Sequence, residues 1–128
     1  MKNKLINLNK YKTSKGYLYK YVDNKSDFFN KFGELYFNLI NKNKKSDWIF
    51  HKKNQCLLSV INGKIKFEFL SKDNKIQKVI LSRKKNYKLL ILPKKTWFRF
   101  IGLENNSILV NLIDNKHQDQ EVIKKDVI

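Results

Sequence analysis

The feature that most constrains the fold is a succession of short apolar segments between residues 34 and 113, each closed by a polar turn. Aromatic and β-branched residues fill these segments, and residues 64–70 alternate strictly between polar and apolar, as expected of a strand with one buried face. Short strands at nearly regular spacing, with no long helical period between them, predict an all-β antiparallel barrel or sandwich. The expected strands are 34–40, 48–51, 56–61, 64–70, 76–81, 89–92, 97–101 and 108–113.

The pattern is weaker in residues 1–32, which mix lysine, asparagine and tyrosine. Alternation around residues 17–21 predicts one or two short strands or an arm, and residues 27–32 predict a turn of helix that ends at Gly33. The Asn62-Gly63 pair is the strongest short hairpin signal in the chain. A chain of 128 residues buries one core, so we expect a single domain over 1–128, with its barrel at 33–126.

The formal net charge of +17 is extreme for this length and raises the hypothesis of a nucleic-acid or membrane partner. Only Arg83 and Arg99 are arginines, and the lysines are spread along a chain that is also rich in asparagine and isoleucine. That composition is typical of A/T-rich coding. Since arginine, not lysine, makes bidentate contacts to phosphate and guanine, nucleic-acid binding is disfavoured, and a general attraction to anions remains.

The single cysteine, Cys56, excludes an internal disulfide framework and a zinc site built from thiolates. The first residues have no apolar stretch of signal-peptide length, and no apolar run reaches 18 residues. We therefore expect a cytoplasmic protein with no membrane partner.

Strand alternation places several polar and aromatic side chains on shared faces. If these faces line one barrel interior, the cavity has aromatic walls, one imidazole, one guanidinium and amides, as a pocket for a polar anionic ligand requires. The faces that parity predicts are Ile49, His51, Lys53 and Gln55; Tyr36 and Asn38; and Trp97 and Arg99.

Two stretches resemble a known superfamily. Residues 48–55, Trp-Ile-Phe-His-Lys-Lys-Asn-Gln, followed by an apolar run to Gly63, resemble the His-Lys-x-x-Gln…Gly segment of dTDP-sugar 3,4-ketoisomerases. Downstream, an ordered set of residues is typical of the dTDP-4-dehydrorhamnose 3,5-epimerase superfamily. That set is Leu81-Ser82, Asn86, Pro93, Trp97 and Phe100 with Leu103. The resemblance covers about residues 33–126 and is closest to short epimerase-like cupins.

The resemblance implies a cupin jelly-roll barrel, a homodimer with strands packed across the interface, and proton transfer beside a ketone without metal or cofactor. The expected role is that of an isomerase acting on a dTDP-4-keto-hexose in surface polysaccharide synthesis. Carried over by residue, His51 is the candidate base and Tyr36 the candidate proton donor. The candidate substrate-binding residues are Arg99 for the diphosphate or enolate oxygen, Trp97 as a stacking wall, and Lys53, Gln55, Asn38 and Asn111.

The chain departs from the family pattern at catalytic positions. Ile49 stands where ketoisomerases have the first histidine of a His-x-His-Lys run, and residues 36–39 replace the Arg-Gly-x-His run of the epimerases. The late-strand tyrosine of the epimerases is absent, with Asn111 in its region. His117, in the polar tail 115–120, is expected to be exposed. Two histidines, with Gln55 where metal cupins place a glutamate, predict no metal site.

Three hypotheses follow. The first is the isomerase, which requires His51 and a proton donor in one cavity. The second is a non-catalytic cupin that binds a sugar nucleotide, with His51 as the only titratable group inside. The third is a basic nucleic-acid-binding β-barrel, on which Tyr17, Tyr19 and Tyr21 would stack against bases.

Overall fold

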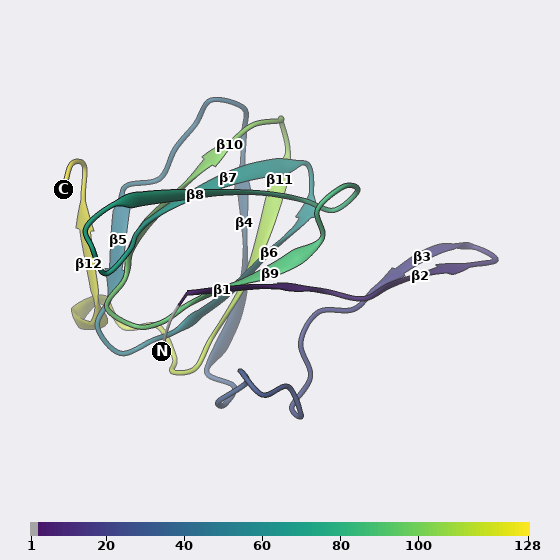
Figure 1. The fold of residues 1–128 in the computed structure, drawn as a ribbon, viewed down its shortest axis with the longest axis horizontal. Helices are drawn as coiled ribbons and strands as arrows, with labels where there is room; N and C mark the ends of the chain where they lie inside the picture. The colour runs from purple at the N-terminus through teal and green to yellow at the C-terminus, as the bar shows by residue number, and fades with distance from the viewer. Residues whose placement is uncertain (1–2) are drawn as a thin grey trace.

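The strands form two five-stranded antiparallel sheets that enclose the interior of a barrel (Figure 1). The structure is a computed structural model that describes residues 3–128. The first sheet has the order β1 (Lys4–Asn7), β9 (Lys88–Leu92), β6 (Cys56–Asn62), β11 (Ser107–Ile113) and β4 (Glu34–Ile40). The second has the order β12 (Val122–Lys125), β5 (Trp48–His51), β10 (Trp97–Gly102), β7 (Lys64–Leu70) and β8 (Ile76–Ser82). The predicted all-β jelly-roll barrel of antiparallel strands is confirmed.

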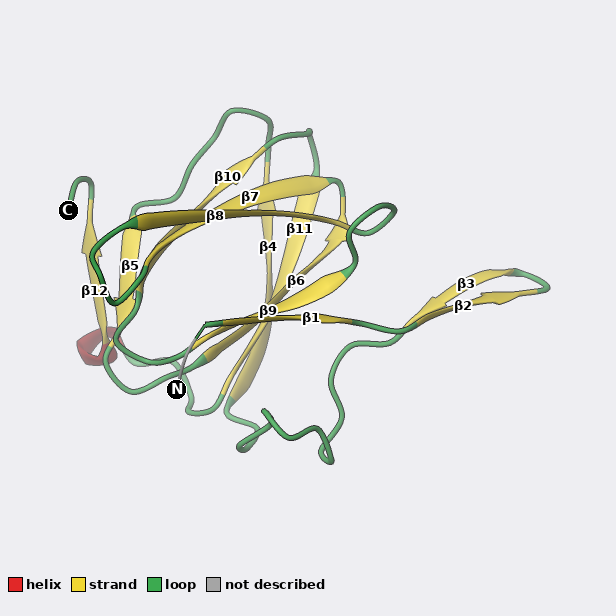
Figure 2. Ribbon diagram, viewed as in Figure 1, coloured by secondary structure: helices red, strands yellow, loops and turns green. Residues whose placement is uncertain are grey.

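All eight strands expected between residues 34 and 113 are present. Strands β4, β5 and β7 have the expected bounds, and each of the other five is one residue longer. The sequence did not predict β12, a short strand in the lysine-rich tail that pairs with β5. A 3-10 helix, η1 (Asp119–Glu121), precedes β12 and is the one helical element among residues 3–128 (Figure 2). Because η1 and β12 lie beside β5, they bring the end of the chain next to His51.

The core between the sheets consists of alternate residues of six strands, which explains the period of two in the sequence. On β7, Ile65, Phe67 and Phe69 are buried, while the residues between them belong to the opposite face. Each fully buried leucine or phenylalanine contributes about 1.5–3 kcal/mol to folding. Cys56 is part of this core, and burial raises the pKa of its thiol to about 12. The thiol is therefore a protonated packing group.

The hairpin predicted at Asn62-Gly63 is wrong. Strand β6 pairs with β9 and β11, and β7 pairs with β8 and β10, so the chain passes from one sheet to the other at this point. Gly63 has φ +71°, and a Cβ there would lie 2.3 Å from the Ser107 Oγ. The same glycine that makes Asn-Gly a hairpin signal serves here as a tight corner between sheets.

The N-terminal region contributes a barrel strand and a projecting arm. Strand β1 pairs with β9, whereas β2 (Lys10–Thr13) and β3 (Gly16–Tyr19) form a separate hairpin that extends away from the barrel (Figure 1). Tyr19 at the base of the arm packs edge-on against Tyr87, with ring centroids 5.1 Å apart.

The helical turn predicted over residues 27–32 is absent. Phe28 and Phe29 instead lie in an irregular segment that packs on the outer apolar face of the first sheet, beside Leu57 and Leu89. The side chain of Gln55 donates a hydrogen bond to the Phe28 carbonyl at 2.9 Å. Tertiary packing of the two aromatic rings therefore overrides the local helical signal.

Across residues 3–128, no helix has the length and apolarity needed to cross a membrane.

Candidate active site

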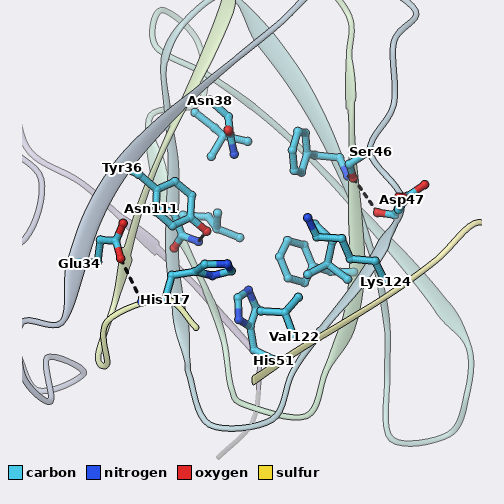
Figure 3. A pocket seen from close by; sticks show the side chains of 15 residues that line it. Glu34, Tyr36, Asn38, Ser46, Asp47, His51, Asn111, His117, Val122 and Lys124 are labelled. Carbon is cyan, nitrogen blue, oxygen red and sulfur yellow. Dashed lines mark hydrogen bonds between the residues drawn. The ribbon is translucent and has the colours of Figure 1, made fainter. Parts of the chain in front are cut away.

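A cavity of about 380 Å³ lies between the two sheets and takes its lining from both of them (Figure 3). It draws on the edge strands β4 and β12 and on β5, β6, β10 and β11. On most of these strands the lining residues are two positions apart, because alternate side chains share a face. The lining is Glu34, Tyr36, Asn38, Ser46, Asp47, Ile49, His51, Leu58, Phe98, Phe100, Leu109, Asn111, His117, Val122 and Lys124.

A buried polar contact at the wall of the cavity joins His51 to Glu121. The Nδ1 atom of His51 lies 2.9 Å from Glu121 Oε2 and 3.2 Å from Oε1, and both side chains are about 5% exposed. Since an ionised carboxylate only accepts hydrogen bonds, Nδ1 carries the hydrogen and Nε2 is the free nitrogen of the neutral ring. The imidazole is also stacked on Phe98, at 17° between the ring planes. His51 therefore has a fixed orientation and tautomer at the cavity wall.

The hydrogen bonds that the Glu121 carboxylate accepts favour its ionised form. Burial by itself raises the pKa of this group, but the hydrogen bond from His51 and those from two backbone amides outweigh it, so the pKa lies below its ordinary value. The Lys53 and Asn54 amides donate to Glu121 Oε1 at 3.0 and 3.2 Å. A negative charge beside Nδ1 stabilises the imidazolium that forms when Nε2 takes up a proton.

Tyr36 and Asn111 form a second polar pair on the wall made by β4 and β11. Asn111 Nδ2 donates to the Tyr36 hydroxyl at 2.7 Å, across directly paired positions of the two strands. Burial raises the pKa of the Tyr36 phenol well above its usual range, so it stays neutral. Because the phenol oxygen already accepts from Asn111, its own hydrogen is available to an oxygen atom in the cavity.

The structure brings together four of the eight predicted site residues. His51, Tyr36, Asn38 and Asn111 all line the cavity, and Ile49 shares the face of His51 as strand parity predicted. Figure 3 shows Tyr36, Asn38 and Asn111 on the wall opposite His51 and Val122.

Arg99 and Trp97 do not line the cavity. Strand β10 directs Phe98 and Phe100 inward, which places its odd-numbered residues on the other face. There the Arg99 Nε donates to Glu68 Oε1 at 2.8 Å, and its guanidinium lies 4.7 Å from the centroid of the Trp48 ring. The anionic partner of Arg99 in this structure is therefore a carboxylate of the protein itself rather than a group in the cavity.

Lys53 and Gln55 also lie outside the lining. Their predicted face required an extended chain beyond His51, but β5 ends at that residue and the backbone bends. Lys53 contributes its backbone amide to Glu121, and Gln55 donates its side-chain amide to Phe28. Both residues therefore hold the segments around the cavity in place.

Several polar residues of the site were not predicted as site residues from the sequence. They are Glu121, which contacts His51, and the lining residues Glu34, Ser46, Asp47, His117 and Lys124. Glu121 lies 70 positions from His51 along the chain. Because a histidine base needs an acceptor for the hydrogen on its second nitrogen, the prediction of His51 as a base already implied a partner such as this carboxylate. His117 is exposed, as expected, yet it lines the cavity mouth. Among residues 3–128 no group of three His, Cys, Asp or Glu side chains is arranged to hold a metal ion.

Comparison with known proteins assigns the chain to a family. The family model for FdtA, described as WxcM-like, C-terminal, matches residues 1–126. A search of curated proteins found no match.

Solved structures of similar fold include sugar-nucleotide enzymes. A dTDP sugar isomerase from Desulfovibrio desulfuricans G20 is 24% identical with a TM-score of 0.90, over 95% of this chain and 82% of that one. The 3,4-ketoisomerase QdtA from Thermoanaerobacterium thermosaccharolyticum, a mutant in complex with TDP-4-keto-6-deoxyglucose, is 18% identical with a TM-score of 0.82, over 95% and 86%. The RmlC epimerase of Mycobacterium tuberculosis is 10% identical with a TM-score of 0.85, over 95% and 68%. The chain belongs to the WxcM-like, C-terminal family and has the cupin fold shared by dTDP-sugar ketoisomerases and RmlC epimerases.

Proposed function

We propose that this protein is a sugar-nucleotide isomerase that moves a proton at the carbon next to the keto group of a dTDP-4-keto-hexose. The observation that carries the proposal is the buried His51–Glu121 pair at the wall of a cavity that Tyr36 also lines. Similar folds that bind TDP-4-keto-6-deoxyglucose or act on TDP-linked sugars support the substrate class.

In this mechanism Nε2 of His51 removes the acidic proton, and the electron pair of the C–H bond forms an enolate. The charge of Glu121, 2.9 Å from Nδ1, stabilises the imidazolium. Tyr36, which burial keeps neutral, donates a hydrogen bond to the enolate oxygen, and its contact with Asn111 orients the hydroxyl for this role. Together these groups supply a base and an oxyanion donor on opposite walls.

We place Lys124 near the anionic part of the ligand. It is the one lysine in the cavity lining of the described residues, and its ammonium matches a diphosphate in charge. The net charge of +17 adds a general attraction to anions.

We further propose that the protein works in the cytoplasm, in synthesis of surface polysaccharide. A single, buried cysteine is compatible with a reducing compartment.

We also propose that the protein acts as a homodimer. Leu35, Phe37 and Leu39 present an apolar row on the outer face of β4, and their side chains are 42%, 58% and 64% exposed. Strand β4 is the edge of its sheet, so its outer backbone groups are free to pair with another strand. The dimer that the family resemblance implies, with strands packed across the interface, would cover this row.

The deciding experiment combines binding and isotope exchange. Calorimetry with dTDP and with dTDP-4-keto-6-deoxyglucose measures affinity, and incorporation of deuterium from heavy water into the bound sugar measures proton removal. We expect exchange with the wild type and loss of exchange, with binding retained, in His51→Asn. Binding without exchange in the wild type would instead identify a non-catalytic sugar-nucleotide cupin. Absence of binding would overturn the proposal and favour a partner for the basic surface, such as nucleic acid.

A further inference from the structure

A second imidazole reaches the same cavity from a part of the chain remote from His51. The chain has two histidines, 66 positions apart, and both line this cavity. His51 is buried on β5, whereas His117 lies in the loop between β11 and η1 with its side chain 39% exposed. Figure 3 shows both imidazoles directed into the cavity that Tyr36 also lines.

The loop that carries His117 is anchored on both sides of the cavity. The backbone amide of His117 donates to Glu34 Oε1 on β4 at 2.9 Å. The Asn115 amide donates to the side chain of Asn54, next to the Glu121 site, at 2.7 Å. Residue 117 takes part in the first contact through its backbone alone, so its position is fixed without use of the imidazole. The ring itself has Asp119 as a neighbour, with 3.5 Å between Nε2 and Oδ1.

An isomerisation can divide its two proton transfers between one group that removes a proton and another that returns one at a different position. Tyr36 is poorly suited to the second task, because burial raises its pKa far from neutrality. Imidazole is the side chain that most often serves as a general acid or base. His117 lines the mouth of the cavity with its side chain 39% exposed, so it is open both to the bound sugar and to water.

Building on the proposed function, we propose that His117 is the second proton-transfer group, which returns a proton to the sugar after His51 has removed one. His51 Nε2 takes the proton, and the C–H electron pair forms the enolate. The N–H bond of the His117 imidazolium then breaks. The electron pair of the enolate double bond forms a new C–H bond with the released proton. In a ketoisomerisation the neighbouring hydroxyl proton passes to the former carbonyl oxygen. His51 is left protonated and His117 neutral, and water restores both.

The test compares two readouts in heavy water, deuterium incorporation into recovered substrate and formation of isomerised product, for the wild type, His51→Asn and His117→Gln. We expect His51→Asn to lose both readouts. We expect His117→Gln to keep incorporation within about threefold while product formation falls about 10²-fold, the usual contribution of a general acid. The ratio of incorporation to product therefore rises, which a purely structural role of the loop would not cause.

Lys116→Gln is the matched control, since Lys116 lies in the same loop and outside the cavity lining. We expect this variant to retain both readouts, and thermal unfolding confirms that each variant is folded. Equal loss of incorporation and product in His117→Gln, or no loss of either, would overturn the assignment. A wild type that gives neither readout would refute the proposed function itself, so the two failures are distinguishable.

Discussion

At the scale of single residues, the proposed proton transfer depends on the contact between His51 and Glu121. We predict that Glu121→Gln lowers kcat about 10²- to 10⁴-fold with little change in KM. The glutamine amide can donate to Nδ1, which favours the tautomer that carries hydrogen on Nε2 and so blocks the base. Steady-state kinetics measures the loss.

Glu104→Gln provides the control for this substitution. Glu104 is an exposed carboxylate, 3.9 Å from Lys64 and outside the cavity lining. Its replacement removes the same charge and leaves the imidazole untouched. If Glu121→Gln retained wild-type kcat, the tautomer of His51 would not be controlled by this carboxylate.

The Glu121 carboxylate also makes the free energy of unfolding depend on pH. The pKa of Glu121 in the folded protein lies below its ordinary value of 4.5, so the unfolded chain binds a proton more readily than the native state does. The resulting stabilisation is fully present above pH 4.5 and is lost as the pH falls through the lowered folded-state pKa. We predict that the free energy of unfolding of the wild type falls in this window, and that Glu121→Gln shows a smaller fall.

Urea unfolding at a series of pH values between neutrality and 3 measures both proteins. Because other carboxylates titrate in the same range, the informative quantity is the difference between wild type and variant at each pH. A difference that stays constant down to pH 3 would show that Glu121 has an unshifted pKa.

At the scale of the elements, the passage of the chain between sheets depends on one glycine. We predict that Gly63→Ala lowers the free energy of unfolding by about 3 kcal/mol, because φ +71° disfavours a side chain and the new methyl group would meet Ser107. Denaturant unfolding measures the loss. Gly16→Ala is the control: it has φ +144°, but it lies on the projecting arm with nothing within 4 Å of the added Cβ. An equal effect of both substitutions would mean that the contact with Ser107 is unimportant.

Element positions follow closely from the sequence, whereas their pairing does not. Alternation marked the strands because each has one buried face, but Asn62-Gly63 is compatible with both a hairpin and a corner between sheets. Likewise, a period of two divides β10 into two faces without identifying the inward one. Phe98 and Phe100 occupy the interior, and Arg99 is therefore directed to Glu68. Burial of aromatic rings decided between the two faces.

Residues of the site were predictable where they lie on regular strands. Tyr36, Asn38 and His51 follow from parity on β4 and β5. Glu121 and His117 come from the polar end of the chain, where no periodic pattern indicates structure. Their placement depends on the pairing of β12 with β5, a contact between segments about 70 residues apart.

At the scale of the whole molecule, the net charge and the apolar row on β4 have opposite effects on association. Two copies that each carry +17 repel each other, whereas burial of Leu35, Phe37 and Leu39 favours contact. The repulsion is screened with a Debye length of about 10 Å at 0.1 M salt. The proposed dimer should therefore be more stable in salt than at low ionic strength, the reverse of an assembly held by ion pairs.

We predict that the wild type has twice the 15.4 kDa mass of one chain at 0.3 M salt, measured by light scattering after size-exclusion chromatography, and that Phe37→Lys is monomeric. The lysine adds charge at the centre of the apolar row and removes a phenyl ring from the interface. Ile80→Lys is the control, because Ile80 is a similarly exposed apolar residue, 47% accessible, on the other edge strand β8. Dissociation by Ile80→Lys alone would place the interface on β8, and a monomeric wild type at every salt concentration would refute the dimer. If Phe37→Lys also retains isotope exchange, each barrel holds a complete site; if it loses exchange, the neighbouring copy completes the cavity along β4.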